Sequence, residues 1–187
     1  MFVRVFFFKR FVASAPNLIP FQVIGKERVP RLSDREDMHY TNAVLQESFR
    51  CVSFAFTAIP HCTTKEVEIG KYIFPKGATI MASMVHIMHD PEYFSEPHVF
   101  NPARFIDENG KFMHHDRVVP FGIGKRYCLG QSLAEKEFFL FVVGFLQKYD
   151  ISPAPMKKLP SYYLDDNTTE NVLRMCPDFE MILTSRI

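Results

Sequence analysis

The chain has 187 residues, of which 47% are apolar and 23% are charged, a balance typical of a globular protein and not of a disordered one. That length is sufficient to bury the core of one domain. The formal net charge is only +1 at pH 7, and no arginine-rich or lysine-rich stretch occurs. The composition therefore excludes the strong basic field typical of nucleic-acid-binding proteins, and we expect no nucleic acid among the partners.

The first 20 residues contain Arg4, Lys9 and Arg10 but no acidic residue. Basic residues interrupt the run of phenylalanines, so this segment predicts neither a membrane span nor a secretory signal. A transit-like or interfacial segment is one interpretation. We favour a leader over residues 1–20 that is unrelated to the rest, as a truncated gene model would produce, followed by a domain over residues 21–187.

Regular patterning begins near Ser33. Residues 34–50 carry acidic side chains early, a basic one late and apolar ones at helical spacing, which predicts a helix of about a dozen residues. Residues 67–80 alternate in polarity and break at Gly70 and again at 75–77, which predicts short hairpin strands. Repeated prolines in residues 82–120 predict short helical turns and coil.

The sequence after Gly130 is strongly helical in pattern as far as Asp150. Residues 138–146 are apolar on nearly every side, which predicts a buried helix, because the run is too short to cross a bilayer. Residues 179–184, FEMILT, predict a final strand. The expected fold class is therefore mainly α with small β hairpins.

The four cysteines are far apart in the chain, and no CxxC pair occurs; they are Cys51, Cys62, Cys128 and Cys176. A chain of this size does not need a disulfide framework, so we interpret them as reduced thiols. The neighbouring pairs 61–62 (His-Cys) and 114–115 (His-His) lack the spacing of a tetrahedral zinc site.

The most informative stretch is PFGIGKRYCLGQSLAEKEF, residues 120–138, which contains one cysteine between two glycines directly ahead of a predicted helix. Gly124 and Gly130 allow sharp backbone turns and close approach to a flat group. The positive end of the following helix, together with Arg126, favours the thiolate form of Cys128. Spacing alone leaves open whether this cysteine is a metal ligand, a nucleophile or an inert core residue.

Several segments together resemble the cytochrome P450 family. Residues 121–130 fit its pattern FxxGxRxCxG at every defined position, LQESFR supplies an ExxR pair, Glu47 and Arg50, and FNPARF supplies a third partner, Arg104. The likeness runs from about residue 21 to the C-terminus. It implies the C-terminal portion of the cytochrome P450 fold, incomplete here, without the central oxygen-activating helix of a full member.

The resemblance also implies a haem b cofactor with Cys128 as the thiolate ligand of its iron. Phe121 would pack against the porphyrin, and Gly124 and Gly130 would shape the loop. Arg126 and His61 would neutralise the two propionates. Glu47, Arg50 and Arg104 would form a buried structural network.

By resemblance to the microsomal animal families, the protein is expected to be a monooxygenase that inserts one oxygen atom of O2 into an apolar small molecule. Its expected partner is an electron-donating reductase. Its expected location is the cytoplasmic face of the endoplasmic reticulum membrane, with mitochondria less favoured, and membrane association is expected of a full-length parent. Glu135 departs from the family, because close relatives carry a basic residue there, which puts reductase docking in doubt.

Two alternatives remain open from the sequence. The chain could be a non-catalytic haem-binding or interaction fragment. It could also be a cysteine hydrolase that uses Cys128 with His114 or His115, although no orienting partner accompanies them. Even as part of a monooxygenase, the chain alone is not expected to hydroxylate a substrate, because the family builds the distal wall from the central helix. The sequence does not identify the substrate or the oligomeric state.

Overall fold

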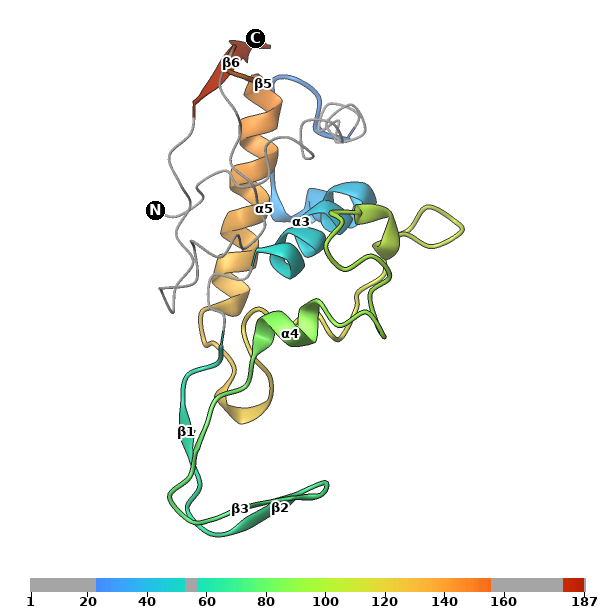
Figure 1. The fold of residues 1–187 in the computed structure, drawn as a ribbon. Coiled ribbons are helices and arrows are strands. Elements are labelled where there is room, and N and C mark those ends of the chain that lie inside the picture. Colours follow the sequence, from blue (N-terminus) through green and yellow to red (C-terminus); the bar gives the residue numbers. More distant parts are fainter. Residues whose placement is uncertain (1–22, 53–56, 156–179, 187) are drawn as a thin grey trace.

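The computed structural model describes residues 23–52, 57–155 and 180–186 (Figure 1). The helices and 3-10 turns are η2 (Leu32–Asp37), α3 (His39–Cys51), α4 (Met84–Met88), η3 (Pro102–Phe105), η4 (Gly124–Arg126) and α5 (Gln131–Lys148). The strands are β1 (His61–Cys62), β2 (Val67–Ile69), β3 (Tyr72–Phe74), β4 (Thr79–Ile80), β5 (Tyr149–Pro153) and β6 (Met181–Ser185). They pair antiparallel as β1 with β4, β2 with β3 and β5 with β6. Helices with small hairpins were the expected composition.

The helix predicted after Ser33 is present, but it is divided. The acidic residues lie in η2, and α3 begins only after Met38, whose backbone angles (φ −103°, ψ 57°) are not helical. The Asp34 carboxylate in η2 accepts the backbone N–H of Arg31 at 2.7 Å and two bonds from the Arg28 guanidinium. The guanidinium of Arg28 lowers the pKa of the Asp34 carboxyl. Asp34 thus caps η2 instead of opening α3.

The predicted hairpin between Val67 and Phe74 is also present, and Figure 1 shows it projecting away from the helices. Its turn contains Gly70 with φ +60°, a left-handed conformation that favours glycine. At the base of the projection, the Thr63 hydroxyl donates to the Pro75 carbonyl at 2.7 Å and accepts the Ala78 N–H at 2.9 Å. These bonds hold the β1–β4 ladder together where few apolar side chains are buried.

The main apolar core lies between α3 and α5, which cross in Figure 1. From α5 it takes Phe139, Val142, Val143 and Leu146, all less than 9% exposed. At the far end of α5 the buried Gln147 side chain donates to the carbonyls of two residues near the start of the described chain, at 2.9 and 2.8 Å. Those bonds hold the segment before η2 against the last turn of α5.

The prediction that α5 would be buried on nearly every side is wrong for one face. The Phe141 side chain is 45% exposed and stacks on Phe145 with a centroid separation of 6.0 Å. An apolar helix face can be buried, but it is buried only where another part of the protein packs against it. In the part of the chain that the structure describes, no helix is long and apolar enough to cross a membrane.

Candidate functional site

The Cys128 loop is a short closed turn between residues 121 and 128. The Cys128 N–H donates to the Phe121 carbonyl at 2.8 Å, and the Tyr127 N–H donates to the Gly124 carbonyl at 3.2 Å within η4. The Cys128 carbonyl then accepts the N–H of Gln131, the first residue of α5, at 3.2 Å. These hydrogen bonds fix the backbone of Cys128 on both sides, and they do not involve its side chain.

The two glycines of the loop have different structural roles. Gly124 has φ +72°, and a Cβ built on it would meet nothing within 4 Å. Gly124 is thus required by backbone conformation. Gly130 has ordinary helical angles (φ −82°, ψ 0°), and a Cβ there would lie 3.7 Å from the Cys128 Sγ, an ordinary van der Waals distance. Both glycines therefore lie in turns, as expected, and only Gly124 has a conformation that favours glycine.

Every residue from 123 to 130, Cys128 included, is exposed to solvent. Cys128 is exposed and is not in a disulfide. Three large apolar side chains nearby in the sequence are strongly exposed, Ile123 at 76%, Leu129 at 94% and Leu133 at 62%. Large exposed apolar side chains on neighbouring residues are characteristic of a binding surface.

Phe121 connects this loop to the helical core. Its ring lies edge-on to Phe49 with centroids 5.3 Å apart, and Phe49 in turn lies edge-on to Phe138 at 5.1 Å. Such pairs contribute about 0.5–1.5 kcal/mol beyond the burial of their area. The three rings come from the loop, α3 and α5, so the aromatic series fixes the loop relative to both helices. Sequence reasoning did not assign Phe49 to the site.

Glu47 and Arg50 of the ExxR pair lie in contact on α3. Arg50 Nε lies 2.6 Å from Glu47 Oε2, and Arg50 Nη2 lies 2.8 Å from Glu47 Oε1. Both side chains are completely buried. A spacing of three residues places them on one helix face, and two parallel bonds give the geometry in which an arginine–carboxylate pair is strongest.

Arg50 also binds carbonyl groups from distant parts of the chain. Its Nη1 donates to the carbonyls of Met88 at 2.9 Å and Pro97 at 2.8 Å, and its Nη2 donates to Val99 at 3.3 Å. Its Cζ lies 5.1 Å from the Phe94 ring centroid. The guanidinium thus holds the coil from α4 to η3 against α3, in a region without regular backbone pairing.

Arg104 completes the cluster from η3. Its Nε lies 3.2 Å from Glu47 Oε1, and its Nη1 and Nη2 donate to the carbonyls of Ser95 and Val99 at 3.0 and 3.1 Å. The backbone N–H of Asn101 adds a bond to the same Glu47 oxygen at 2.8 Å. Glu47 is therefore buried with several donors, as a buried carboxylate requires.

His61 and Arg126 are exposed. His61 lies in β1, where it pairs with Ile80, and Arg126 lies in η4 beside the cysteine loop. Within the described ranges, no hydrogen bond or ion pair joins His61 to the loop. The structure therefore brings Glu47, Arg50 and Arg104 together, and it connects Phe121, Gly124, Arg126, Cys128 and Gly130 along one loop. It provides no contact that links His61 to them.

The two histidines considered for a hydrolase lie elsewhere. His114 Nε2 is 3.9 Å from Asp116 Oδ1 at the surface, and the His115 ring packs 4.7 Å from the Phe94 ring. Burial lowers the pKa of His115. Among the described residues neither ring forms a hydrogen bond with Cys128, so the geometry does not support a Cys–His nucleophile.

Comparison with known proteins gives the family. The family model for cytochrome P450 matches residues 21–173, more than half of the chain. The chain belongs to the cytochrome P450 family. This confirms the resemblance inferred from the ExxR pair and the cysteine pattern.

The similar proteins are larger cytochromes P450. Cytochrome P450 2C20 of Macaca fascicularis is 36% identical over 160 residues, which cover 85% of this chain and 32% of that protein. Cytochrome P450 2C8 of Homo sapiens is 41% identical over 129 residues, covering 69% of this chain and 26% of that protein. Cytochrome P450 2C28 of Mesocricetus auratus is also 41% identical over 129 residues. The chain spans about a third or less of the length of these curated relatives.

Cytochromes P450 hold a haem cofactor through a cysteine thiolate. The cysteine loop of this chain fits such a cofactor on its own geometry. An exposed thiol provides the donor that thiolate-ligated haem requires. The open space beside Gly124 and the exposed apolar side chains around the loop are suited to a flat, mainly apolar group.

Proposed function

We propose that this protein is a haem-thiolate monooxygenase of apolar small molecules, with haem b as its cofactor and Cys128 as the thiolate ligand. The observation that carries the proposal is the exposed Cys128 thiol on a loop fixed by its own hydrogen bonds and by Phe121. When bound, the haem supplies O2 cleavage with two electrons from a reductase, placing one oxygen atom in the substrate and the other in water.

The residues of the loop prepare the position of the sulfur. The Cys128 N–H bond to Phe121 fixes the Cα of the cysteine, and the packing of Phe121 on Phe49 keeps the loop from moving relative to α3. Within the described residues, the N–H groups of Leu129 and Gly130 donate to no protein oxygen, so they remain available to the sulfur. We propose that these donors adjust the charge on the thiolate.

We propose that the Arg126 and His61 side chains bind the two haem propionates. Both side chains are exposed, and a guanidinium or an imidazole forms charge-assisted hydrogen bonds with a carboxylate. Arg126 is two residues from Cys128 and shares its loop. The assignment of His61 depends on the resemblance alone.

The proposed partners are an electron-donating reductase and a hydrophobic substrate. The proposed location is the endoplasmic reticulum membrane on its cytoplasmic face, through a longer parent protein. Glu135 stands where close relatives carry a basic residue. Its carboxylate accepts a hydrogen bond from the Gln131 side chain at 2.9 Å. We therefore expect this part of the surface to contribute less to docking of an acidic reductase than it does in those relatives.

Two measurements on the 187-residue chain test the cysteine assignment. Added haem should protect Cys128 from a thiol reagent and leave the exposed Cys62 reactive, so Cys62 serves as the internal control. The reduced, CO-bound chain should show a strongly red-shifted Soret band, which Cys128→Ser abolishes and Cys62→Ser keeps. Equal protection of both thiols, or a red-shifted band in Cys128→Ser, would remove Cys128 from the ligand role.

Turnover is a separate proposal. The Cys128 loop provides one face for a flat cofactor, and by resemblance to the family the opposite face would come from a central helix upstream of the matched residues. We propose that the chain alone with haem and reductase forms no product, whereas a version extended by upstream family sequence does. Efficient product formation by the 187-residue chain would contradict this.

A further inference from the structure

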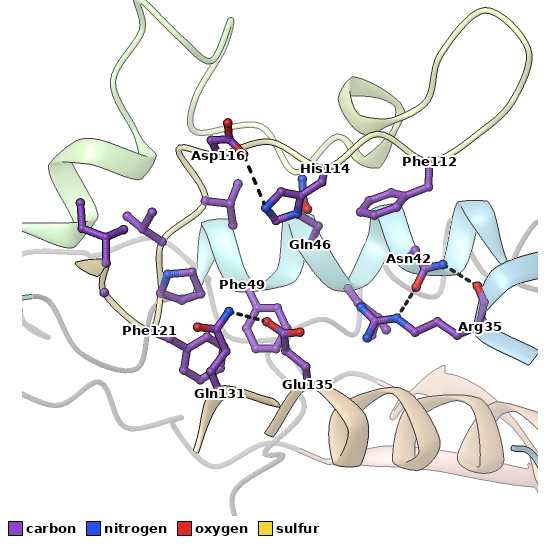
Figure 2. A pocket seen from close by; sticks show the side chains of 16 residues that line it. Arg35, Asn42, Gln46, Phe49, Phe112, His114, Asp116, Phe121, Gln131 and Glu135 are labelled. Carbon is purple, nitrogen blue, oxygen red and sulfur yellow. Dashed lines mark hydrogen bonds and ion pairs between the residues drawn. The ribbon is translucent and has the colours of Figure 1, made fainter. Parts of the chain in front are cut away.

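A pocket that Cys128 does not line, but that shares residues 121–123 with the Cys128 loop, lies between α3, residues 112–123 and the first turns of α5, and Figure 2 shows it from close by. Its volume is about 240 Å³, below the roughly 300–1,000 Å³ that drug-sized ligands occupy. A molecule that fits it would be the size of one substituted ring.

One wall of the pocket is apolar and aromatic. Leu45, Phe49, Val119 and Phe121 line it, and the edge-on contact of Phe49 with Phe121 leaves ring surface at the wall. Aromatic side chains bind planar rings through offset or edge-on contacts. This wall therefore favours an unsaturated ring over a branched aliphatic group.

The second observation is a buried amide without a partner. Gln46 lines the pocket with only 6% of its surface exposed, and its Nε2 has no hydrogen-bond partner among the described residues. Buried donors are nearly always satisfied, because an unpaired one loses its bonds to water without replacement. The Gln46 amide therefore requires an acceptor that enters from the pocket.

The third observation is that two carboxylates, those of Asp116 and Glu135, and one guanidinium, that of Arg35, line the same pocket. Arg35 uses its Nε for the Asn42 Oδ1 at 2.8 Å, and Glu135 accepts from Gln131 at 2.9 Å. No ion pair joins Arg35 to Glu135 within the described part of the chain. The two carboxylates repel an anion, and the Glu135 carboxylate offers an acceptor to an N–H donor, so the pocket favours a ligand that carries both an acceptor and a donor over an anionic one.

We propose that this pocket binds a small neutral aromatic carboxamide. Its carbonyl oxygen accepts from Gln46 Nε2, its N–H group donates to the Glu135 carboxylate, and its ring lies on Phe49 and Phe121. A carboxamide offers an acceptor and a donor on different atoms without net charge. An alcohol has both on one oxygen and reaches only one of the two partners.

The test uses benzamide with the 187-residue chain, followed by ligand-observed saturation-transfer NMR. Benzamide should bind with a Kd on the order of 1 mM, as expected for a ligand of this size. Benzoate, benzylamine and benzyl alcohol, which share the ring, should each bind at least about tenfold more weakly. Equal binding of any of these three compounds would overturn the proposal. Absence of saturation transfer to benzamide would also overturn it, and would mean that water alone satisfies the Gln46 amide.

Two variants assign the binding to this pocket. Gln46→Leu removes the amide and should weaken benzamide binding about tenfold or more, while Glu135→Gln should raise the affinity for benzoate relative to benzamide. Asn109→Leu removes an exposed amide in a surface turn and should change neither affinity. Circular dichroism establishes that each variant keeps the helix content of the parent. Unchanged affinity in a folded Gln46→Leu chain would contradict the assignment.

Discussion

The Glu47 carboxylate and the Arg50 guanidinium form a two-bond ion pair from which water is completely excluded, at 2.6 and 2.8 Å. Removal of one partner leaves the other charge buried, which costs about 3–5 kcal/mol. We therefore expect Arg50→Ala or Glu47→Ala to lower the free energy of unfolding by that amount in urea titrations, and to prevent stable haem incorporation. Loss of only a few tenths of a kcal/mol would contradict the role of the pair.

The matched control for that experiment is Arg28, whose pair with Asp34 is also made of two bonds but whose side chain is 38% exposed. Solvent screens such a pair. Arg28→Ala should therefore shift the urea midpoint much less than Arg50→Ala. Similar shifts in the two variants would mean that burial does not determine the effect.

Cys51 should make the stability depend on alkaline pH. Burial, with the negative charge of Glu47 beside it, raises the pKa of the Cys51 thiol to about 12. The thiol of the unfolded chain ionises at about pH 9, so between that pH and the folded pKa only the native state keeps this proton. The free energy of unfolding therefore falls as the pH rises, by at most about 1.4 kcal/mol per pH unit. Urea titrations from pH 7 to 10.5 should show a steeper decline for the parent than for Cys51→Ala. Parallel declines would show that the thiol does not contribute.

Thiol labelling should separate the cysteines by burial. Cys62 and Cys128 are exposed and Cys51 is buried, so a chain carrying Cys176→Ser should label at two sites when folded and at three in urea. Peptide mass analysis identifies the sites. Labelling of Cys51 in the native state would indicate that the region around Glu47 opens readily.

Two phenylalanines of α5 provide a matched pair for testing the core. Phe139 is completely buried and Phe141 is 45% exposed. Phe139→Ala should lower the free energy of unfolding by about 3–5 kcal/mol. Phe141→Ala should cost much less and should reduce self-association at high concentration, because it removes part of an exposed apolar face. Light scattering and urea titration measure the two effects. Equal destabilisation by both would contradict the orientation of α5.

The sequence predicted the parts of this molecule that depend on local rules. The spacing of Glu47 and Arg50 places them on one face of a helix, and the break at Gly70 gives the hairpin turn. The division of the helix at Met38 was not predicted, because the non-helical backbone there occurs at a buried residue whose packing a local pattern does not specify. The exposed face of α5 was missed for a related reason, since burial depends on neighbours that a local pattern does not specify.

The candidate site was predicted unevenly. The motif identified Cys128, and the structure supports an exposed thiol on a shaped loop. Phe49 was missed because its role arises from contact with Phe121, more than 70 residues later in the sequence. The carbonyl partners of Arg50 have no sequence signature at all, because every residue carries a carbonyl. Gln46 resembled an ordinary helix position until its buried, unpaired amide was visible.

Arg50 behaves toward residues 88–99 as a bound cation does toward a coordinating loop. The carbonyls of Met88, Pro97 and Val99 converge on one positive group, and little regular backbone pairing supports the chain between them. The bonds from Arg50, together with those from Arg104 and the turns within the coil, therefore fix its shape. The separation of 38 residues between Arg50 and Met88 makes this a long-range contact. Substitutions within the coil that keep its carbonyls in place should thus be tolerated far better than any change at the arginine that organises them.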